Sequence, residues 1–252
     1  MPTPAGYADL LPPPLPALGD VALFLDMDGV LAPIEATPEA VTADPRRTAV
    51  LVRLGHRLQG RLAILSGRTI AEIDRIADGA VASVAGVHGL ERREGGEVRR
   101  PVADPALGDA VAAFRDFARA RPGARVEDKG LSTALHYRLV PDHAHAALDL
   151  ALDLAAVTGL TLQRGDMVVE LRTPGADKGA ALKAFMALAP FQGATPVMLG
   201  DDLTDEDAFR AAVDLGGCGV LVGPPRPTAA SWRLPRQGDV LAWLEALAEA
   251  PA

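Results

Sequence analysis

Short apolar segments that each run directly into polar residues constrain the fold of this sequence more than any other feature. VALFL at 21–25 leads into DMDG, RLAIL at 61–65 leads into SGR, and PVML at 196–199 leads into GDD. Apolar runs of this length are typical of strands that are buried on both faces of a parallel sheet. The sequence therefore predicts an α/β fold in which helices connect these strands.

Signals for the start of a helix lie between the apolar segments. Asp44 precedes Pro45, a pair typical of a helix N-cap and first turn. Thr69 and Asp177 are further predicted caps, and Thr204 with an acidic residue three positions on resembles a capping box. Helices are predicted over 45–58, 70–77, 178–188, 205–213 and 240–248, and additional strands over 81–85 and 219–222.

The pattern changes after residue 90. ERREGGEVRR at 91–100 alternates charge about a Gly-Gly turn, which is typical of a surface hairpin. STALHYRLV at 132–140 alternates apolar and polar residues, as in an antiparallel sheet with one exposed face. This segment is predicted to form an α+β unit with further strands over 124–130, 160–163 and 167–171 and helices over 105–121 and 142–157.

These segments predict a discontinuous domain organisation. A doubly wound, Rossmann-like α/β core would comprise residues 20–90 and 172–252, and an α+β cap domain of residues 91–171 would be inserted into it. Residues 1–19 are rich in proline and are expected to form a loose N-terminal arm.

Composition excludes several classes of protein. The chain has 25 basic and 33 acidic residues and no dense Lys/Arg block, so a nucleic-acid partner is not expected. Its one cysteine, Cys218, excludes an intrachain disulfide and a multi-cysteine metal site. No apolar run approaches the roughly 20 residues of a membrane-spanning helix, and the first 18 residues lack the basic start of a signal peptide. We expect a cytoplasmic protein without a membrane partner.

Acidic residues follow two of the predicted strands. Because ligands of open parallel sheets bind beyond the carboxyl ends of the strands, Asp26, Asp28, Asp201 and Asp202 are expected to meet at one edge. Clustered carboxylates repel one another unless a cation lies among them, and a set of oxygen ligands favours Mg²⁺ over Zn²⁺. Ser66 and Lys178 would add a hydroxyl group and a positive charge, which suit a phosphate group.

The ordered segments DMDGV, SGR, Lys178 and GDDLTDED resemble the four motifs of the haloacid dehalogenase superfamily. GVHGLE at 86–91, HYR at 136–138, VELRTPGADKG at 169–179 and SWRL at 231–234 are similar to segments of its trehalose-6-phosphate phosphatase family. The resemblance covers nearly the whole chain after residue 20. It implies a Mg²⁺-dependent phosphatase that converts trehalose 6-phosphate to trehalose and phosphate through an aspartyl-phosphate intermediate.

Two residues depart from the family pattern without changing the nucleophile or a metal ligand. Val30 stands where the first motif usually has Thr, and Arg172 stands where the family often has Lys. The family pattern implies that Asp26 is the nucleophile and that Asp28 is first the general acid and then the general base. The other implied roles are metal binding by Asp26, Asp28 through its carbonyl, Asp201 and Asp202, support of the metal or a helix cap by Asp205, and phosphate binding by Ser66, Gly67 and Lys178.

A disaccharide presents hydroxyl groups, so its binding site needs polar and charged partners. Glu127, Lys129 and Glu170 are the candidates in or near the cap, with Arg68 and His88 as further substrate contacts. The sequence leaves open whether His136 and Arg138 contact the sugar or form a structural pair in the cap sheet. A trehalose-phosphate synthase is the expected pathway neighbour.

Three alternative functions remain open from sequence alone. The first is a phosphatase of another sugar phosphate, such as sucrose or mannosylglycerate phosphate. The second is a phosphate-sensing domain without turnover, which the presence of both Asp26 and Asp28 disfavours. The third is a glycosidase with two carboxylates, which has no use for Lys178 and a second acidic cluster.

Overall fold

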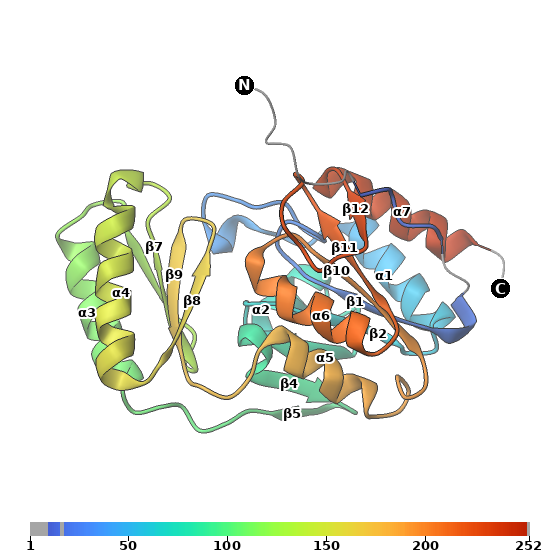
Figure 1. Cartoon of the computed structure of the whole chain (residues 1–252), viewed down its shortest axis with the longest axis horizontal. Helices are drawn as coiled ribbons and strands as arrows, with labels where there is room; N and C mark the ends of the chain where they lie inside the picture. The colour runs from blue at the N-terminus through green and yellow to red at the C-terminus, as the bar shows by residue number, and fades with distance from the viewer. Residues whose placement is uncertain (1–9, 16–17, 251–252) are drawn as a thin grey trace. The chain divides into compact units, whose positions relative to one another are not determined.

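The computed structural model describes residues 10–15 and 18–250. These residues form two compact units (Figure 1). Among the described residues, the first unit comprises 10–15, 18–99, 177–201 and 205–250, and the second comprises 100–176 and 202–204. The second unit is therefore an insertion into the chain of the first.

An eight-stranded sheet forms the centre of the first unit, in the order β12-β11-β10-β1-β2-β3-β4-β5. Neighbours from β12 to β3 are parallel, and β4 and β5 are antiparallel additions. Because β1 lies between β10 and β2, the carboxyl ends of these three strands meet at one edge of the sheet. The strands are β1 (Val21–Leu25), β2 (Leu62–Leu65), β3 (Ser83–Gly86), β4 (Glu91–Glu94), β5 (Glu97–Arg99), β10 (Thr195–Gly200), β11 (Cys218–Val222) and β12 (Trp232–Leu234).

Helices cover both faces of this sheet. The helices are α1 (Pro45–Arg57), α2 (Ile70–Ala77), α5 (Lys178–Met186), α6 (Glu206–Asp214) and α7 (Gln237–Glu249). Leu23 and Leu25 of β1 pack with α1, α2 and α7, whereas Ala22 and Phe24 pack with α5 and α6. Alternate residues of one strand thus enter two separate cores, which explains its continuous apolar run and confirms the prediction of a doubly wound fold.

Three of the four predicted helix caps are confirmed. The side chains of Asp44, Thr69 and Asp177 each accept a hydrogen bond from a backbone N–H of the helix that follows. Thr204, by contrast, does not cap α6, so this prediction is wrong. Leu203–Asp205 form a 3₁₀ turn, and the N-cap residue of α6 is Asp205, whose side chain makes no capping hydrogen bond.

The second unit contains a four-stranded antiparallel sheet, in the order β6-β7-β9-β8. Leu135, Val169 and Leu171 pack on one face of this sheet against the helices, which confirms the predicted α+β insert. The elements are β6 (Arg125–Asp128), β7 (Ser132–His136), β8 (Thr161–Gly165), β9 (Val168–Arg172), α3 (Leu107–Arg119) and α4 (Ala144–Thr158). None of the helices in the described part of the chain is long and apolar enough to cross a membrane.

The hairpin of β4 and β5 belongs to the first unit, whereas the sequence pattern placed residues 91–99 in the insert. Val84 to Gly86 of β3 pair with Glu91 to Arg93 of β4 and so extend the large sheet. Arg93 also forms an ion pair of 2.7 Å with Asp74 on α2. The charge pattern identified the hairpin, but these partners lie in distant parts of the sequence.

Part of the proline-rich arm is held in place. The carbonyl of Leu11 accepts a hydrogen bond of 3.0 Å from the backbone N–H of Arg233 on the edge strand β12, and the carbonyl of Pro13 accepts one of 3.2 Å from the Trp243 indole. The prediction of a loose arm is therefore wrong at Leu11 and Pro13. Residues 1–9 and 16–17 lie outside the described residues.

Candidate active site

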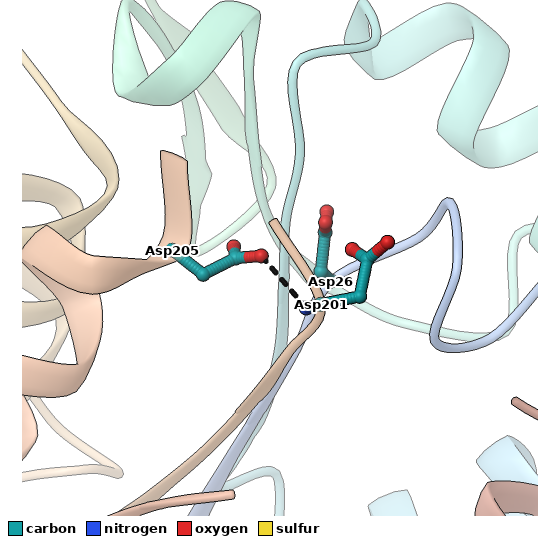
Figure 2. A group of neighbouring side chains, drawn as sticks. All are labelled: Asp26, Asp201 and Asp205. Atoms are coloured by element: carbon teal, nitrogen blue, oxygen red, sulfur yellow. Dashed lines mark hydrogen bonds between the residues drawn. The ribbon is translucent and has the colours of Figure 1, made fainter. Parts of the chain in front are cut away.

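Three carboxylates meet at the carboxyl edge of the large sheet. Asp26, Asp201 and Asp205 each offer an oxygen atom, and these atoms lie within 4.8 Å of one another (Figure 2). Asp26 directly follows β1, and its backbone N–H donates to the carbonyl of Leu199 on β10, which joins the two strand ends. Asp26 and Asp205 are buried and Asp201 is half-buried, so the cluster concentrates negative charge at a largely buried site.

Asp205 is a central member of this cluster, although the sequence pattern implied only a supporting or capping role for it. One carboxylate oxygen accepts a hydrogen bond of 3.0 Å from the backbone N–H of Asp201, and the other accepts one of 2.6 Å from Lys178. A Cβ atom on Gly200 would lie 2.4 Å from the Asp205 carboxyl carbon, so glycine is needed for this approach. The turn at 201–205 thus returns Asp205 to the end of the strand from which Asp201 extends.

Lys178 is a buried cation between two buried anions. Its Nζ atom lies 2.6 Å from Asp205 and 3.0 Å from Asp26, and its side chain is 2% exposed. Burial alone would lower the pKa of Lys178, but the charges of Asp205 and Asp26 raise it, so the side chain stays protonated. Burial and the charge of Asp205 raise the pKa of Asp26, and the Lys178 ammonium opposes them.

Asp28 lies outside the three-carboxylate cluster and pairs with Arg68. Nε and Nη2 of Arg68 lie 2.7 and 2.8 Å from the two carboxylate oxygens of Asp28. Nη1 of the same guanidinium donates to the carbonyl of Pro38 at 3.0 Å. The sequence predicts that Arg68 binds the substrate, and this stays a prediction. In the structure its guanidinium fixes the orientation of the Asp28 side chain.

The SGR turn after β2 packs against the GVHG turn after β3. The backbone N–H of His88 donates to the Ser66 carbonyl at 2.9 Å, and that of Val87 donates to the Arg68 carbonyl at 2.8 Å. A Cβ atom on Gly67 would lie 2.7 Å from Nε2 of His88, so the imidazole rests directly on this glycine. His88 therefore helps to shape the turn that presents the buried Ser66.

In the second unit, charged side chains share the face of the small sheet opposite its helices. Ala134 on β7 pairs with Glu127 on β6 and with Glu170 on β9, so the two carboxylates lie on one row with only a methyl group between them. The Lys129 ammonium lies 3.0 Å from Glu170 and 3.9 Å from Glu127. The structure thus brings together the three residues that were predicted to contact the sugar.

His136 and Arg138 do not form a pair. His136 lies 2.8 Å from Glu127, whereas Arg138 forms an exposed ion pair of 2.9 Å with Asp166. Asp202, one of the predicted metal ligands, accepts a hydrogen bond of 2.7 Å from the backbone N–H of Leu203 and is not a member of the three-carboxylate cluster.

Sequence reasoning missed an ion pair that supports the acidic turn. The buried Glu206 pairs with Arg226, and its second oxygen accepts a hydrogen bond of 2.8 Å from the backbone N–H of Ala229. Arg226 also donates to the Asp201 carbonyl at 3.4 Å. The acidic run GDDLTDED points to Glu206, but no feature of the sequence identifies its partner.

Comparison with known proteins identifies the group to which this arrangement belongs. The family model described as trehalose-phosphatase matches residues 24–237. The trehalose-6-phosphate phosphatase of Escherichia coli K12 is 41% identical over 237 residues, which cover 91% of this chain and 87% of that protein. A probable trehalose-phosphate phosphatase of Sinorhizobium fredii is 38% identical over 84% of this chain and 81% of its own length.

Solved structures agree with these sequence relatives. The crystal structure of a trehalose-6-phosphate phosphatase related protein has a TM-score of 0.77 and 27% identity, and the match covers 91% of this chain and 97% of that chain. The C-terminal domain of Candida albicans trehalose-6-phosphate phosphatase has the same fold, with a TM-score of 0.85 over 98% of this chain and 100% of that one at 22% identity. The resemblance found in the motifs is confirmed, and the chain belongs to the trehalose-phosphatase family.

Proposed function

We propose that this chain hydrolyses trehalose 6-phosphate to trehalose and inorganic phosphate through a phosphorylated Asp26. The observation that carries the proposal is the buried contact of Asp26 with Lys178 beside Asp201 and Asp205, in a chain that matches the trehalose-phosphatase family over residues 24–237. A fixed ammonium beside a carboxylate offsets the charge repulsion between a phosphate monoester and its attacking nucleophile.

The donor set fits a divalent cation. Three carboxylates and one ammonium leave two net negative charges when all four groups are ionised, and the candidate ligands are hard oxygen atoms. Asp26, Asp201 and Asp205, together with the carbonyl of Asp28, would hold Mg²⁺. When bound, Mg²⁺ supplies charge neutralisation for the phosphate oxygens and for the carboxylate cluster.

The proposed reaction has two steps. The Asp26 carboxylate attacks phosphorus, so that a bond forms between its oxygen and phosphorus while the bond from phosphorus to the sugar oxygen breaks. Asp28, in its carboxylic acid form, donates a proton to that sugar oxygen and trehalose leaves. The resulting Asp28 carboxylate, which Arg68 orients, then takes a proton from the water that attacks the acyl phosphate, which releases phosphate and restores both Asp26 and the acid form of Asp28. Lys178 and Ser66 stabilise the negative charge of the phosphate oxygens.

A comparison of substrates tests the proposal. Phosphate release would be measured with Mg²⁺ for trehalose 6-phosphate, sucrose 6-phosphate, mannosylglycerate phosphate and p-nitrophenyl phosphate. We expect kcat/KM for trehalose 6-phosphate to exceed the others by at least about tenfold, because hydrogen-bonding sites discriminate strongly between polar substrates. A larger kcat/KM for another sugar phosphate would assign the protein to that substrate instead.

Removal of divalent cations is expected to stop turnover. Dialysis against EDTA should lower phosphate release by at least about 100-fold, since a metal ion contributes several kcal/mol of charge stabilisation. Mg²⁺ should restore the rate, and Zn²⁺ should restore it poorly because the candidate ligands include no thiolate or imidazole. Undiminished phosphate release in metal-free buffer would show that the reaction does not require a divalent cation.

Gly29→Ala is expected to disrupt the carboxylate cluster. Gly29 has a φ angle of +73°, and a Cβ atom there would lie 2.0 Å from an oxygen of Asp201. The Asp201 side chain must therefore move, and we expect weaker Mg²⁺ binding in calorimetric titration and at least about 100-fold slower turnover. Gly55→Ala in α1, where nothing lies within 4 Å, is the matched control and should behave as the wild type. Equal Mg²⁺ binding by both variants would contradict the role of Asp201.

Glu127→Ala is expected to impair the hydrolysis of trehalose 6-phosphate more than that of p-nitrophenyl phosphate. Loss of one sugar hydrogen bond should lower kcat/KM for trehalose 6-phosphate by about 5- to 150-fold, whereas p-nitrophenyl phosphate has no sugar to lose contact with. Asp128→Ala on the same strand is the control, because its exposed side chain lies on the other face. Equal losses on both substrates would show that Glu127 supports the fold rather than the sugar.

A further inference from the structure

The HYR motif contains a histidine that the proposed mechanism does not use. Nε2 of His136 on β7 lies 2.8 Å from Oε2 of Glu127 on β6. Both side chains are partly exposed, at 27% and 21%. The contact joins an otherwise unassigned residue to one of the three residues proposed to bind the sugar.

The strand register explains why His136 reaches Glu127. Glu127 pairs directly with Ala134, whereas His136 pairs with Arg125, two residues before Glu127 on β6. Such diagonal neighbours on one face of a sheet are within reach of long or aromatic side chains. The methyl group of Ala134 offers no hydrogen bond to the carboxylate, and Lys129 lies farther away at 3.9 Å. His136 is therefore the contact that fixes the Glu127 side chain.

The chemistry of the two groups determines the direction of this hydrogen bond. An ionised carboxylate can only accept, so the tautomer that suits the contact carries its hydrogen atom on Nε2 of His136 and donates it to Glu127. Burial would raise the pKa of Glu127, but the hydrogen bond from His136 and the charge of Lys129 lower it, which keeps Glu127 ionised. Oε1 of Glu127 accepts no hydrogen bond from any residue that the structure describes.

We propose that His136 is a positioning residue, which holds Oε2 of Glu127 so that Oε1 is presented as the acceptor for a hydroxyl group of the disaccharide phosphate. The inference rests on the proposed function and extends it to a residue that does not itself contact the sugar. Oε2 of Glu127 thus accepts a hydrogen bond from His136, and Oε1 is left to accept one from the sugar. A glutamate without this contact would adopt several rotamers and would have to be ordered when the sugar binds.

A double-mutant cycle tests this dependence. The kcat and KM values for trehalose 6-phosphate and p-nitrophenyl phosphate would be measured for the wild type, His136→Ala, Glu127→Ala and the double variant. We expect His136→Ala to lower kcat/KM for trehalose 6-phosphate by about 5- to 50-fold, mainly through KM, and to change p-nitrophenyl phosphate hydrolysis by less than about twofold. The kcat/KM of the double variant for trehalose 6-phosphate should equal that of Glu127→Ala within about twofold, because His136 acts through Glu127.

Two further variants separate positioning from general support of the sheet. His136→Gln places an amide N–H near the site of Nε2 and should recover most of the lost kcat/KM, whereas Arg138→Ala removes a neighbouring exposed ion pair and should match the wild type on both substrates. The proposal is overturned if His136→Ala has the wild-type kcat/KM for trehalose 6-phosphate, or if the substitution lowers kcat/KM for both substrates equally. It is also overturned if His136→Ala lowers kcat/KM as much in the Glu127→Ala background as in the wild type. Absence of trehalose 6-phosphate hydrolysis in the wild type would instead overturn the proposed function.

Discussion

Asp26→Asn is expected to lower phosphate release from trehalose 6-phosphate by at least about 1,000-fold, the largest loss among the variants of this site. The amide keeps the shape of the side chain but is a very poor nucleophile, and one negative charge of the carboxylate cluster is lost. Asp26 is 5% exposed and lies 3.0 Å from Lys178, so the ammonium lies directly beside the proposed nucleophile. Initial rates with saturating Mg²⁺ would measure the loss.

Asp207→Asn is the matched control for this variant. Asp207 lies in the acidic segment GDDLTDED, which also contains Asp201 and Asp205 of the cluster, but it is exposed on α6 and forms a surface ion pair with Arg210. We expect the control to retain wild-type activity, and both variants to keep the wild-type circular dichroism spectrum. Retention of more than a few per cent of activity by a pure preparation of Asp26→Asn would remove Asp26 from the role of nucleophile.

Lys178→Met is expected to lose both activity and stability. The substitution removes the ammonium from two buried carboxylates, at 2.6 Å from Asp205 and 3.0 Å from Asp26. Leaving a buried charge without its partner costs about 3 to 5 kcal/mol, although protonation of Asp26, whose pKa is already raised, would absorb part of the cost. Urea unfolding measures the free energy of unfolding, and phosphate release measures the loss of charge stabilisation at the phosphate.

Lys183→Met on the same helix is the control for this experiment. Its ion pair with Asp214 is exposed, at 53% and 63%, so the free energy of unfolding should change by less than about 0.5 kcal/mol. The double variant Lys178→Met/Asp205→Asn should recover part of the lost stability, because one uncompensated charge is removed. Equal stability of the Lys178→Met and Lys183→Met variants would contradict the assignment of Lys178 as the counter-charge of the site.

Local signals were sufficient to predict the core of the fold. The continuous apolar run at 21–25 arises because successive residues of β1 enter cores on opposite faces of the sheet, and a strand buried on both faces has no other pattern available. Asp44 and Thr69 cap their helices through backbone N–H groups two or three residues away. Both kinds of signal depend on residues that are near one another in the sequence.

Features that depend on distant partners could not be predicted in the same way. The hairpin of β4 and β5 was recognisable from its turn, but its pairing with β3 depends on which edge of the large sheet is available. The hydrogen bond to the Leu11 carbonyl comes from Arg233 on the edge strand β12, more than 200 residues away in the sequence. Thr204 has the spacing of a capping box, yet Leu203–Asp205 form a 3₁₀ turn, which places Asp205 in the carboxylate cluster instead.

The candidate site likewise has features that the sequence could predict and features that it could not. The meeting of Asp26, Ser66 and Asp201 at one edge follows from the order of parallel strands, so the sequence could predict it. The bidentate contact of Arg68 with Asp28 and the contact of His136 with Glu127 depend on side-chain directions and strand register. Residue spacing alone does not specify such directions, and these contacts therefore emerged only from the structure.

Detection of a phosphorylated Asp26 would test the central claim most directly. The enzyme would be mixed with trehalose 6-phosphate and Mg²⁺, quenched in acid during steady-state turnover, cleaved with a protease that works at low pH, and analysed by mass spectrometry. We expect the added mass of one phosphoryl group on the peptide that contains Asp26, and its absence from Asp26→Asn. Rapid hydrolysis of trehalose 6-phosphate with a phosphoryl group on another residue would contradict the assignment of Asp26 as the nucleophile.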